Sequence, residues 1–144
     1  MANKAGLSIF EFYDNFYENM LDKQVRDKFS KHFLYHLKKY KGKKIELCES
    51  ALVSEKMFRH IKVGKFLKKE PILALLIVMN LDLDEIQKAL RMAGLILSRS
   101  MYNDVVVIWI IENNLHNRGA KRLQYINEVL ESLGLPLLMT RMHI

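Results

Sequence analysis

Apolar residues recur along the chain at intervals of three and four, which is the spacing of one helix face. Only two prolines and six glycines interrupt the 144 residues, and this scarcity favours helices joined by short turns over a turn-rich β fold. The predicted fold class is therefore all-α. Helices are expected at about residues 7–22, 23–41, 44–51, 54–62, 70–80, 83–93, 101–113 and 121–133.

Two apolar segments fit a strand as well as a helix when they are judged by period or propensity alone. Residues 72–79 are apolar throughout, but Pro71 suits the first turn of a helix and the neighbouring segments are helical. This segment is predicted to be the buried central helix. Residues 105–108 are all β-branched, which favours a strand, although the wider segment 101–113 is interpreted as helical.

Several predicted helix ends carry the residues that usually mark them. Ser54 can accept a backbone N–H as an N-cap, and either Asp82 or Asp84 can do the same for the helix near 83–93. Glycines suit the ends of helices because they enter the left-handed region at little cost. The glycines that follow predicted helices are Gly42, Gly64 and Gly94.

The net charge of +7 is concentrated in one third of the chain. Residues 23–69 hold fifteen Lys or Arg against four acidic residues, a balance of +11. Residues 1–22 carry −3 and residues 70–144 carry −1. Solubility alone does not require such a concentration, so the basic third is a candidate surface for binding a polyanion.

The cellular compartment of the protein can be inferred from its cysteine content, its N-terminal stretch and the length of its apolar runs. A single cysteine, Cys48, excludes an internal disulfide and indicates a reducing environment. The N-terminal apolar stretch contains acidic residues, unlike a signal peptide. The longest apolar run is eight residues, against the roughly 20 that span a bilayer. A cytoplasmic protein with no membrane partner is expected.

Signatures of catalysis or metal binding are weak. The chain has no Gly-rich phosphate loop, no nucleophile elbow and no evident Cys/His pair, so it is predicted not to be an enzyme and to need no cofactor. His32 and His36 have the spacing of two ligands on one helix face, but they lack the Glu and third ligand of a zinc-protease helix. They are interpreted as ordinary polar surface. His60 is expected to pack or to touch a phosphate.

A longer pattern begins in the basic third. The stretch 46–64, followed by Pro71, the apolar run and the segment 80–86, resembles the lambda-repressor-like (Cro-type) helix-turn-helix family. With residues 28–41 as the first helix, five helices fall in order across 28–93. The resemblance implies a five-helix core, to which this chain adds an N-terminal helix and a C-terminal helical pair. Four apolar residues are spaced to lock two short helices across a turn: Leu47, Val53, Phe58 and Ile61.

The resemblance also implies a surface that binds double-stranded DNA. In such units the second helix of the pair enters the major groove by its N-terminal residues. The face presented to the bases would be Ser54, Glu55, Lys56, Arg59 and Lys62. Arg59 is the best candidate for a bidentate contact to guanine. The residues expected to meet phosphates are Lys43, Lys44, Lys65, Lys68 and Lys69.

The sequence departs from the family pattern at the turn. Cys48 stands where Ala is common and Leu52 where Gly is common, and the turn there favours a left-handed backbone that leucine enters only at a cost. Glu55 would also repel phosphates. These features favour an alternative function, a protein-interaction module (an anti-repressor, an antitoxin-like partner or an accessory subunit) on a degenerate scaffold.

The expected organisation is an N-terminal amphipathic helix (1–22), a helix-turn-helix domain (23–94) and a C-terminal extension (95–144). The extension is similar to the tail of certain small Firmicute helix-turn-helix proteins, so a bacterial transcription regulator is expected. Both flanks hold more apolar surface than the five-helix core needs: Phe10, Phe12, Phe16 and Tyr17 on one side, and Val106, Trp109, Ile110, Leu137 and Leu138 on the other. The excess, above all in 95–144, is predicted to form a homodimer interface.

Overall fold

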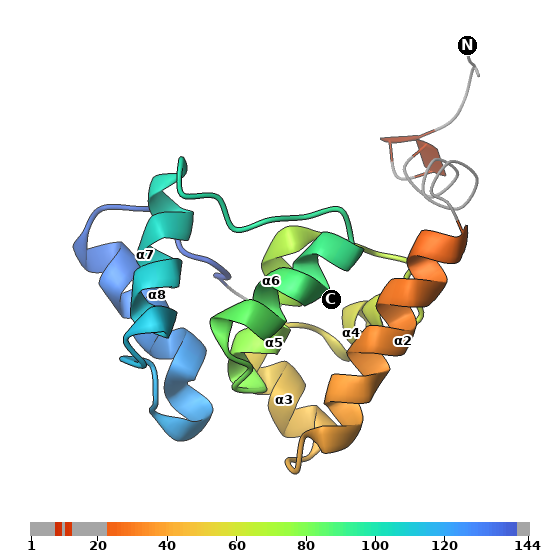
Figure 1. Ribbon diagram of the computed structural model, residues 1–144, viewed down its shortest axis with the longest axis horizontal. Helices are drawn as coiled ribbons and strands as arrows, with labels where there is room; N and C mark the ends of the chain where they lie inside the picture. The colour runs from red at the N-terminus through yellow and green to blue at the C-terminus, as the bar shows by residue number, and fades with distance from the viewer. Residues whose placement is uncertain (1–7, 10, 13–22, 141–144) are drawn as a thin grey trace.

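The structure, a computed structural model, describes residues 8, 9, 11, 12 and 23–140 (Figure 1). In these residues all of the regular secondary structure is helical, which confirms the all-α class. The predicted helix at 7–22 lies outside the described residues apart from four positions. The helices are α2 (Lys23–Lys39), α3 (Lys44–Ala51), α4 (Glu55–Lys62), α5 (Lys69–Val78), α6 (Leu83–Met92), α7 (Tyr102–Glu112), the short 3₁₀ helix η1 (Gly119–Lys121) and α8 (Arg122–Ser132).

Helix α5 is the centre of the molecule, as its unbroken apolar run predicts. Every residue from Pro71 to Val78 is buried. Helices α3, α6 and α8 all pack against α5, so it is covered on several sides (Figure 1). A helix that is apolar all round is stable in water only in such an environment.

Helices α2 to α6 pack against one another around an apolar core that they share. Helix α2 contacts both α4 and α6, and α3 contacts α4 and α5. Phe29 and Phe33 of α2 are fully buried, and the ring centroid of Phe33 lies 6.2 Å from that of Phe58 on α4. The helices of residues 23–94 therefore close around a shared apolar core.

Helices α7 and α8 lie side by side at the opposite end of the molecule from α2 (Figure 1). Helix α8 packs on α3 and α5, and α7 packs on α6. Three residues of α8, Leu123, Ile126 and Leu130, are buried in the same cluster as the residues of α5. The apolar core is therefore continuous from residues 23–94 into residues 95–140.

The connection between α6 and α7 is held by polar contacts. Gln87 on α6 donates to the Leu97 carbonyl at 3.0 Å and accepts from the Leu97 N–H at 3.1 Å. The Asp104 carboxylate accepts from the Ser98 N–H at 2.8 Å and pairs with the Lys69 ammonium at 2.6 Å. Asp104 thereby joins α7 to the first turn of α5.

The helix ends follow most of the sequence signals. The Ser54 hydroxyl accepts from the Met57 N–H at 3.1 Å, as predicted. Of the two candidate caps for α6, the structure selects Asp82, which forms a capping box with Glu85. The prediction for Gly42 is wrong: α2 ends at Lys39, the Tyr40 N–H closes its last turn, and Gly42 has no left-handed backbone.

Helix α7 forms in spite of its β-branched run. Asp104, Val107, Ile108 and Ile111 recur at helical spacing and are buried. Burial of this face outweighs the strand propensity of residues 105–108 because propensity is a weak preference that packing overrides.

Candidate nucleic-acid interface

Helices α3 and α4 are joined by a three-residue turn with a left-handed first residue. Leu52 has φ 58° and ψ 34°, so the left-handed turn predicted for this position is present. The N–H of Leu52 bonds to the Glu49 carbonyl and that of Val53 to the Cys48 carbonyl, which closes the end of α3 in a Schellman arrangement. The four residues expected to lock the two helices, Leu47, Val53, Phe58 and Ile61, are all buried.

The C-terminal end of α4 is fixed against α2. The Ser30 hydroxyl donates to the Lys62 carbonyl at 2.6 Å. Gly64 follows with φ +78°, and a Cβ built there would lie 2.7 Å from the Arg26 carbonyl oxygen. Only glycine fits this close approach, so the position of α4 depends on Gly64.

One face of α4 is open to solvent. Met57, Phe58 and Ile61 face inward, whereas Glu55, Lys56, Arg59 and His60 are exposed. Lys62 is half-buried, with its ammonium 5.6 Å from the centre of the Phe58 ring. Lys56 and Arg59 are three residues apart and therefore project from the same face of the helix.

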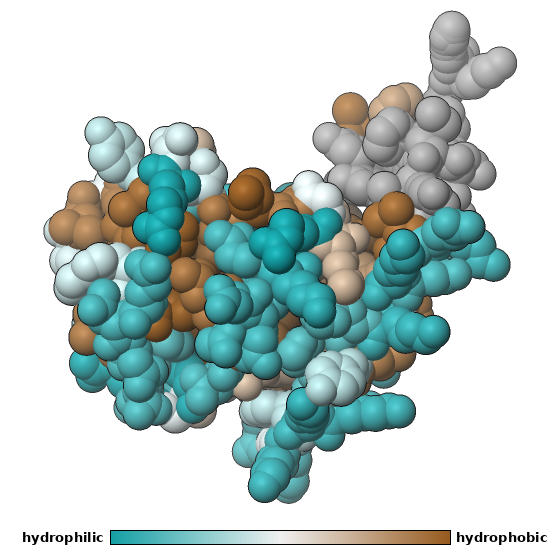
Figure 2. Space-filling model, in the orientation of Figure 1, coloured by the Kyte–Doolittle hydropathy of each residue, from teal (hydrophilic) through white to brown (hydrophobic). Residues whose placement is uncertain are grey.

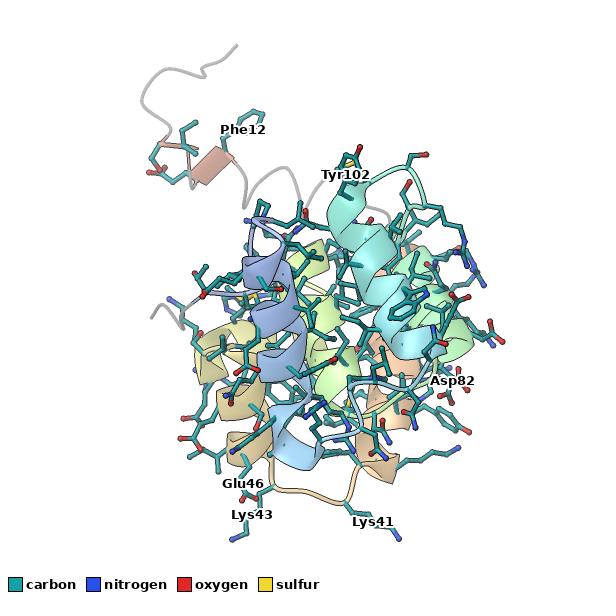
Figure 3. All side chains as sticks on the ribbon, turned by 90° about the vertical axis from the view of Figure 1, so that its left-hand side faces the viewer. Phe12, Lys41, Lys43, Glu46, Asp82 and Tyr102 are labelled. Atoms are coloured by element: carbon teal, nitrogen blue, oxygen red, sulfur yellow. The ribbon has the colours of Figure 1, made fainter. Side chains whose placement is uncertain are left out.

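A second group of cations lies where α2 gives way to α3. Lys43 and Lys44 are exposed at the N-terminal end of α3. Figure 3 shows Lys41 and Lys43 projecting outward at the end of the molecule opposite Tyr102. No side chain caps the first turn of α3, so its N–H groups and these lysines offer positive charge to an anion, opposed by the carboxylate of Glu46 in the same turn.

The remaining predicted site residues divide into two groups. Lys65 and Lys68 are exposed between α4 and α5. Ser54 is only 8% exposed and its hydroxyl already caps α4, so it does not belong to the open face. Lys69 is half-buried and its charge is balanced by Asp104, which removes it from the set of cations open to a ligand.

Asp104 is a residue that no sequence pattern connects with this surface. It lies thirty-five residues from Lys69, and no local pattern links the two positions. Two exposed apolar residues beside the lysines, Ile45 on α3 and Val63 at the end of α4, were also not anticipated. Both stand next to predicted basic residues, which is the only signal in the sequence that could have indicated them.

The His32–His36 pair is not the ordinary polar surface that was predicted. His36 is only 6% exposed, and the Nε2 atoms of the two rings are 3.2 Å apart. Burial is the main cause that lowers the pKa of each imidazole, and the proximity of His36 lowers the pKa of His32 further. His36 is buried because α6 packs against α2.

The chemistry available to Cys48 is limited by its burial. Burial raises the pKa of the Cys48 thiol, with smaller contributions from the carboxylates of Glu55 and Glu49. A protonated, inaccessible thiol is a poor nucleophile. Within the described residues, no group of three or more His, Cys, Asp or Glu is placed to hold a metal ion. The helices of the described part of the chain also lack the length and apolar character of a membrane span.

Comparison with known proteins gives no further guidance. No family model, no curated protein and no solved structure matches the chain.

Proposed function

We propose that this chain is a sequence-specific DNA-binding transcriptional regulator in which α3 and α4 form the helix-turn-helix. In this proposal α2–α6 make up a lambda-repressor-like five-helix unit and α4 is the recognition helix. The observation that carries it is the open face of α4, where Lys56 and Arg59 project from a helix whose other face buries Phe58 and Ile61. The +11 charge of residues 23–69 supports the same reading.

The roles of the individual residues follow from this placement. The N-terminal part of α4 would enter the major groove, with Arg59 contacting guanine and Lys56 beside it. Lys43 and Lys44 would meet phosphates on one side of the groove, and Lys65 and Lys68 would do so on the other. Ser54 and Lys69 would not contact DNA; Ser54 caps α4 and Lys69 pairs with Asp104. The Glu55 carboxylate would repel nearby phosphates and so restrict the positions that α4 can take along the groove.

Binding to genomic duplex fragments, measured by fluorescence anisotropy over a salt series, tests the proposal. We expect saturable binding that favours some duplexes over others and over heparin, with an affinity that falls as salt rises. Equal binding of all duplexes and heparin, or no duplex binding at low salt, would remove the proposal.

Two substitutions should separate base reading from charge. Arg59→Ala should weaken binding to a preferred site by about 1–3 kcal/mol and reduce its preference over other sequences. Lys68→Ala should weaken binding to all sequences about equally and make the salt dependence shallower. Lys121→Ala, an exposed lysine outside α3 and α4, is the control and should change neither. Identical effects of Arg59→Ala and Lys68→Ala would identify a nonspecific polyanion surface.

We further propose that the regulator binds as a homodimer through α7 and α8. One short recognition helix reads only a few base pairs, so symmetric dimers are the usual solution. An apolar groove of about 330 Å³ lies between these helices, and Trp109, which lines it, is 59% exposed. Figure 2 shows apolar surface gathered over this end of the molecule. Ile110, first assigned to the flanking apolar excess, is buried within the chain.

Trp109→Glu should dissociate the dimer because it places a charge in the apolar interface. Light scattering at micromolar concentration should change from the mass of two chains to that of one. Lys121→Glu, which alters charge elsewhere on the extension, should leave the mass unchanged. An intact protein that is already monomeric would exclude this interface.

A second candidate function, a protein-interaction module, is favoured by one observation. A groove of about 420 Å³ between α3 and α8 borders Leu52 and is lined by three carboxylates, Glu49, Glu128 and Glu131. Negative charge so close to the helix-turn-helix suits a basic protein segment better than a phosphate backbone. Affinity purification from the native host distinguishes the two: a stoichiometric protein partner with no DNA retained would favour the module.

A further inference from the structure

His32 and His36 stand one turn apart on α2 with their imidazole rings converging. Their Nε2 atoms are 3.2 Å apart, and the ring planes meet at 85° with centroids 4.7 Å apart. Neither Nε2 atom has another hydrogen-bond partner among the contacts found in the described residues. The two nitrogen atoms therefore face each other from consecutive turns of the same helix.

We propose that this pair is a binding site for a divalent transition-metal ion, Zn²⁺ in particular, with both Nε2 atoms as ligands. In a tetrahedral zinc site with Zn–N distances of about 2.0–2.1 Å, two ligand nitrogens are about 3.3–3.4 Å apart. The observed separation is within a few tenths of an ångström of that value. To bind the ion, the two rings would have to turn so that both Nε2 lone pairs point at it instead of at each other. This inference does not depend on the proposed DNA binding.

The two rings are held in place before any ion arrives. The Tyr35 ring lies against both imidazoles, with centroids 6.5 Å from His32 and 5.2 Å from His36. His36 is packed against α6 and almost fully buried, whereas His32 is half-buried and gives access from solvent. A site with pre-oriented ligands loses little side-chain freedom when it binds.

The charges around the pair come from α2 and α6. Glu85 and Asp82 on α6 favour a cation, whereas Lys39 and Lys88 oppose it. Because the described residues bring no third ligand to the pair, water would complete the coordination. The site would thus be an open one of moderate affinity.

The competing explanation is an N–H···N hydrogen bond between two neutral rings, which needs no ion. Isothermal titration of the full-length protein with ZnCl₂ at neutral pH distinguishes the two. We expect one zinc ion per chain, and His32→Gln should weaken its binding by more than about tenfold. His32 is the ligand to replace because it is half-buried, so the variant should still fold.

His60→Gln is the matched control, since His60 is an exposed histidine on α4 that is not a member of the pair, and it should bind zinc like the natural protein. A second readout needs no variant: the imidazole ¹⁵N resonances of His32 and His36 should shift together on addition of zinc. No zinc binding, equal zinc binding by His32→Gln, or zinc-induced shifts confined to other histidines would each overturn the proposal.

Discussion

Alanine in place of Gly64 is expected to lower the free energy of unfolding by about 2–5 kcal/mol. Gly64 has φ +78°, a backbone region that costs an L-residue about 1–2 kcal/mol. The new Cβ would also meet the Arg26 carbonyl oxygen at 2.7 Å, and backbone cannot move aside as a side chain can. Relieving such a clash typically costs a further 1–3 kcal/mol, roughly. Urea denaturation followed by circular dichroism measures the sum.

Gly94 supplies the matched control for this substitution. It has a similar φ of +75°, but a Cβ there would meet nothing within 4 Å. Gly94→Ala should therefore cost only about 1–2 kcal/mol, the conformational part alone. The difference between the two losses of stability measures the cost of the clash between a Cβ at position 64 and the Arg26 carbonyl oxygen on α2. Equal losses would show that the chain relaxes at Arg26 and that Gly64 does not fix the position of α4.

The helices could be predicted from the sequence because their signal is local. Periodic apolar residues and the run at 72–79 placed α3–α8 within a few residues of their observed bounds. The caps at Ser54 and Asp82 are also local signals, since each oxygen meets an N–H three residues away. The prediction that Gly42 ends α2 was wrong because glycine can end a helix but does not have to. The last turn of α2 closes earlier, through the Tyr40 N–H.

On α4, the solvent exposure of the candidate site residues could be predicted from the sequence. The exposure of Lys56 and Arg59 follows from the helix period once Phe58 and Ile61 face inward. Ser54 lies next to this face in the sequence, but its predicted cap on the Met57 N–H keeps its hydroxyl away from the open surface. Ile110 was predicted to belong to the exposed apolar surface, but it is buried. A helix with apolar residues on both sides does not show from its sequence which side is buried.

Contacts between distant segments were not predictable at all. The burial of His36 depends on α6, and the neutralisation of Lys69 depends on Asp104 of α7. Neither partner is indicated by spacing, since any of several acidic residues could pair with any lysine. The basic charge of residues 23–69 therefore overstates what is open to a ligand.

Lys69→Met is expected to destabilise the protein by about 3–5 kcal/mol because it leaves the Asp104 carboxylate buried with only the Ser98 N–H as a partner. Asp104→Asn should cost less. Asparagine can still accept from Ser98, and the Lys69 side chain, 25% exposed, can turn its ammonium toward water. Both losses are read from denaturant midpoints at neutral pH.

A surface ion pair between the segment before α7 and the end of α7 gives the comparison. Arg99 and Glu112 are 3.0 Å apart but both are exposed, so Glu112→Gln should change stability by less than about 1 kcal/mol. An equally large loss there would mean that distance, and not burial, decides the strength of these pairs.

The double variant Lys69→Met/Asp104→Leu decides what the buried pair contributes. It removes both charges and keeps apolar volume at the joint between α5 and α7. If the cost of Lys69→Met comes from a stranded buried carboxylate, the double variant should be more stable than Lys69→Met alone. If it is less stable, the pair itself stabilises the joint. In that case Asp104 would hold the C-terminal helices in register with the helix-turn-helix by direct attraction to Lys69.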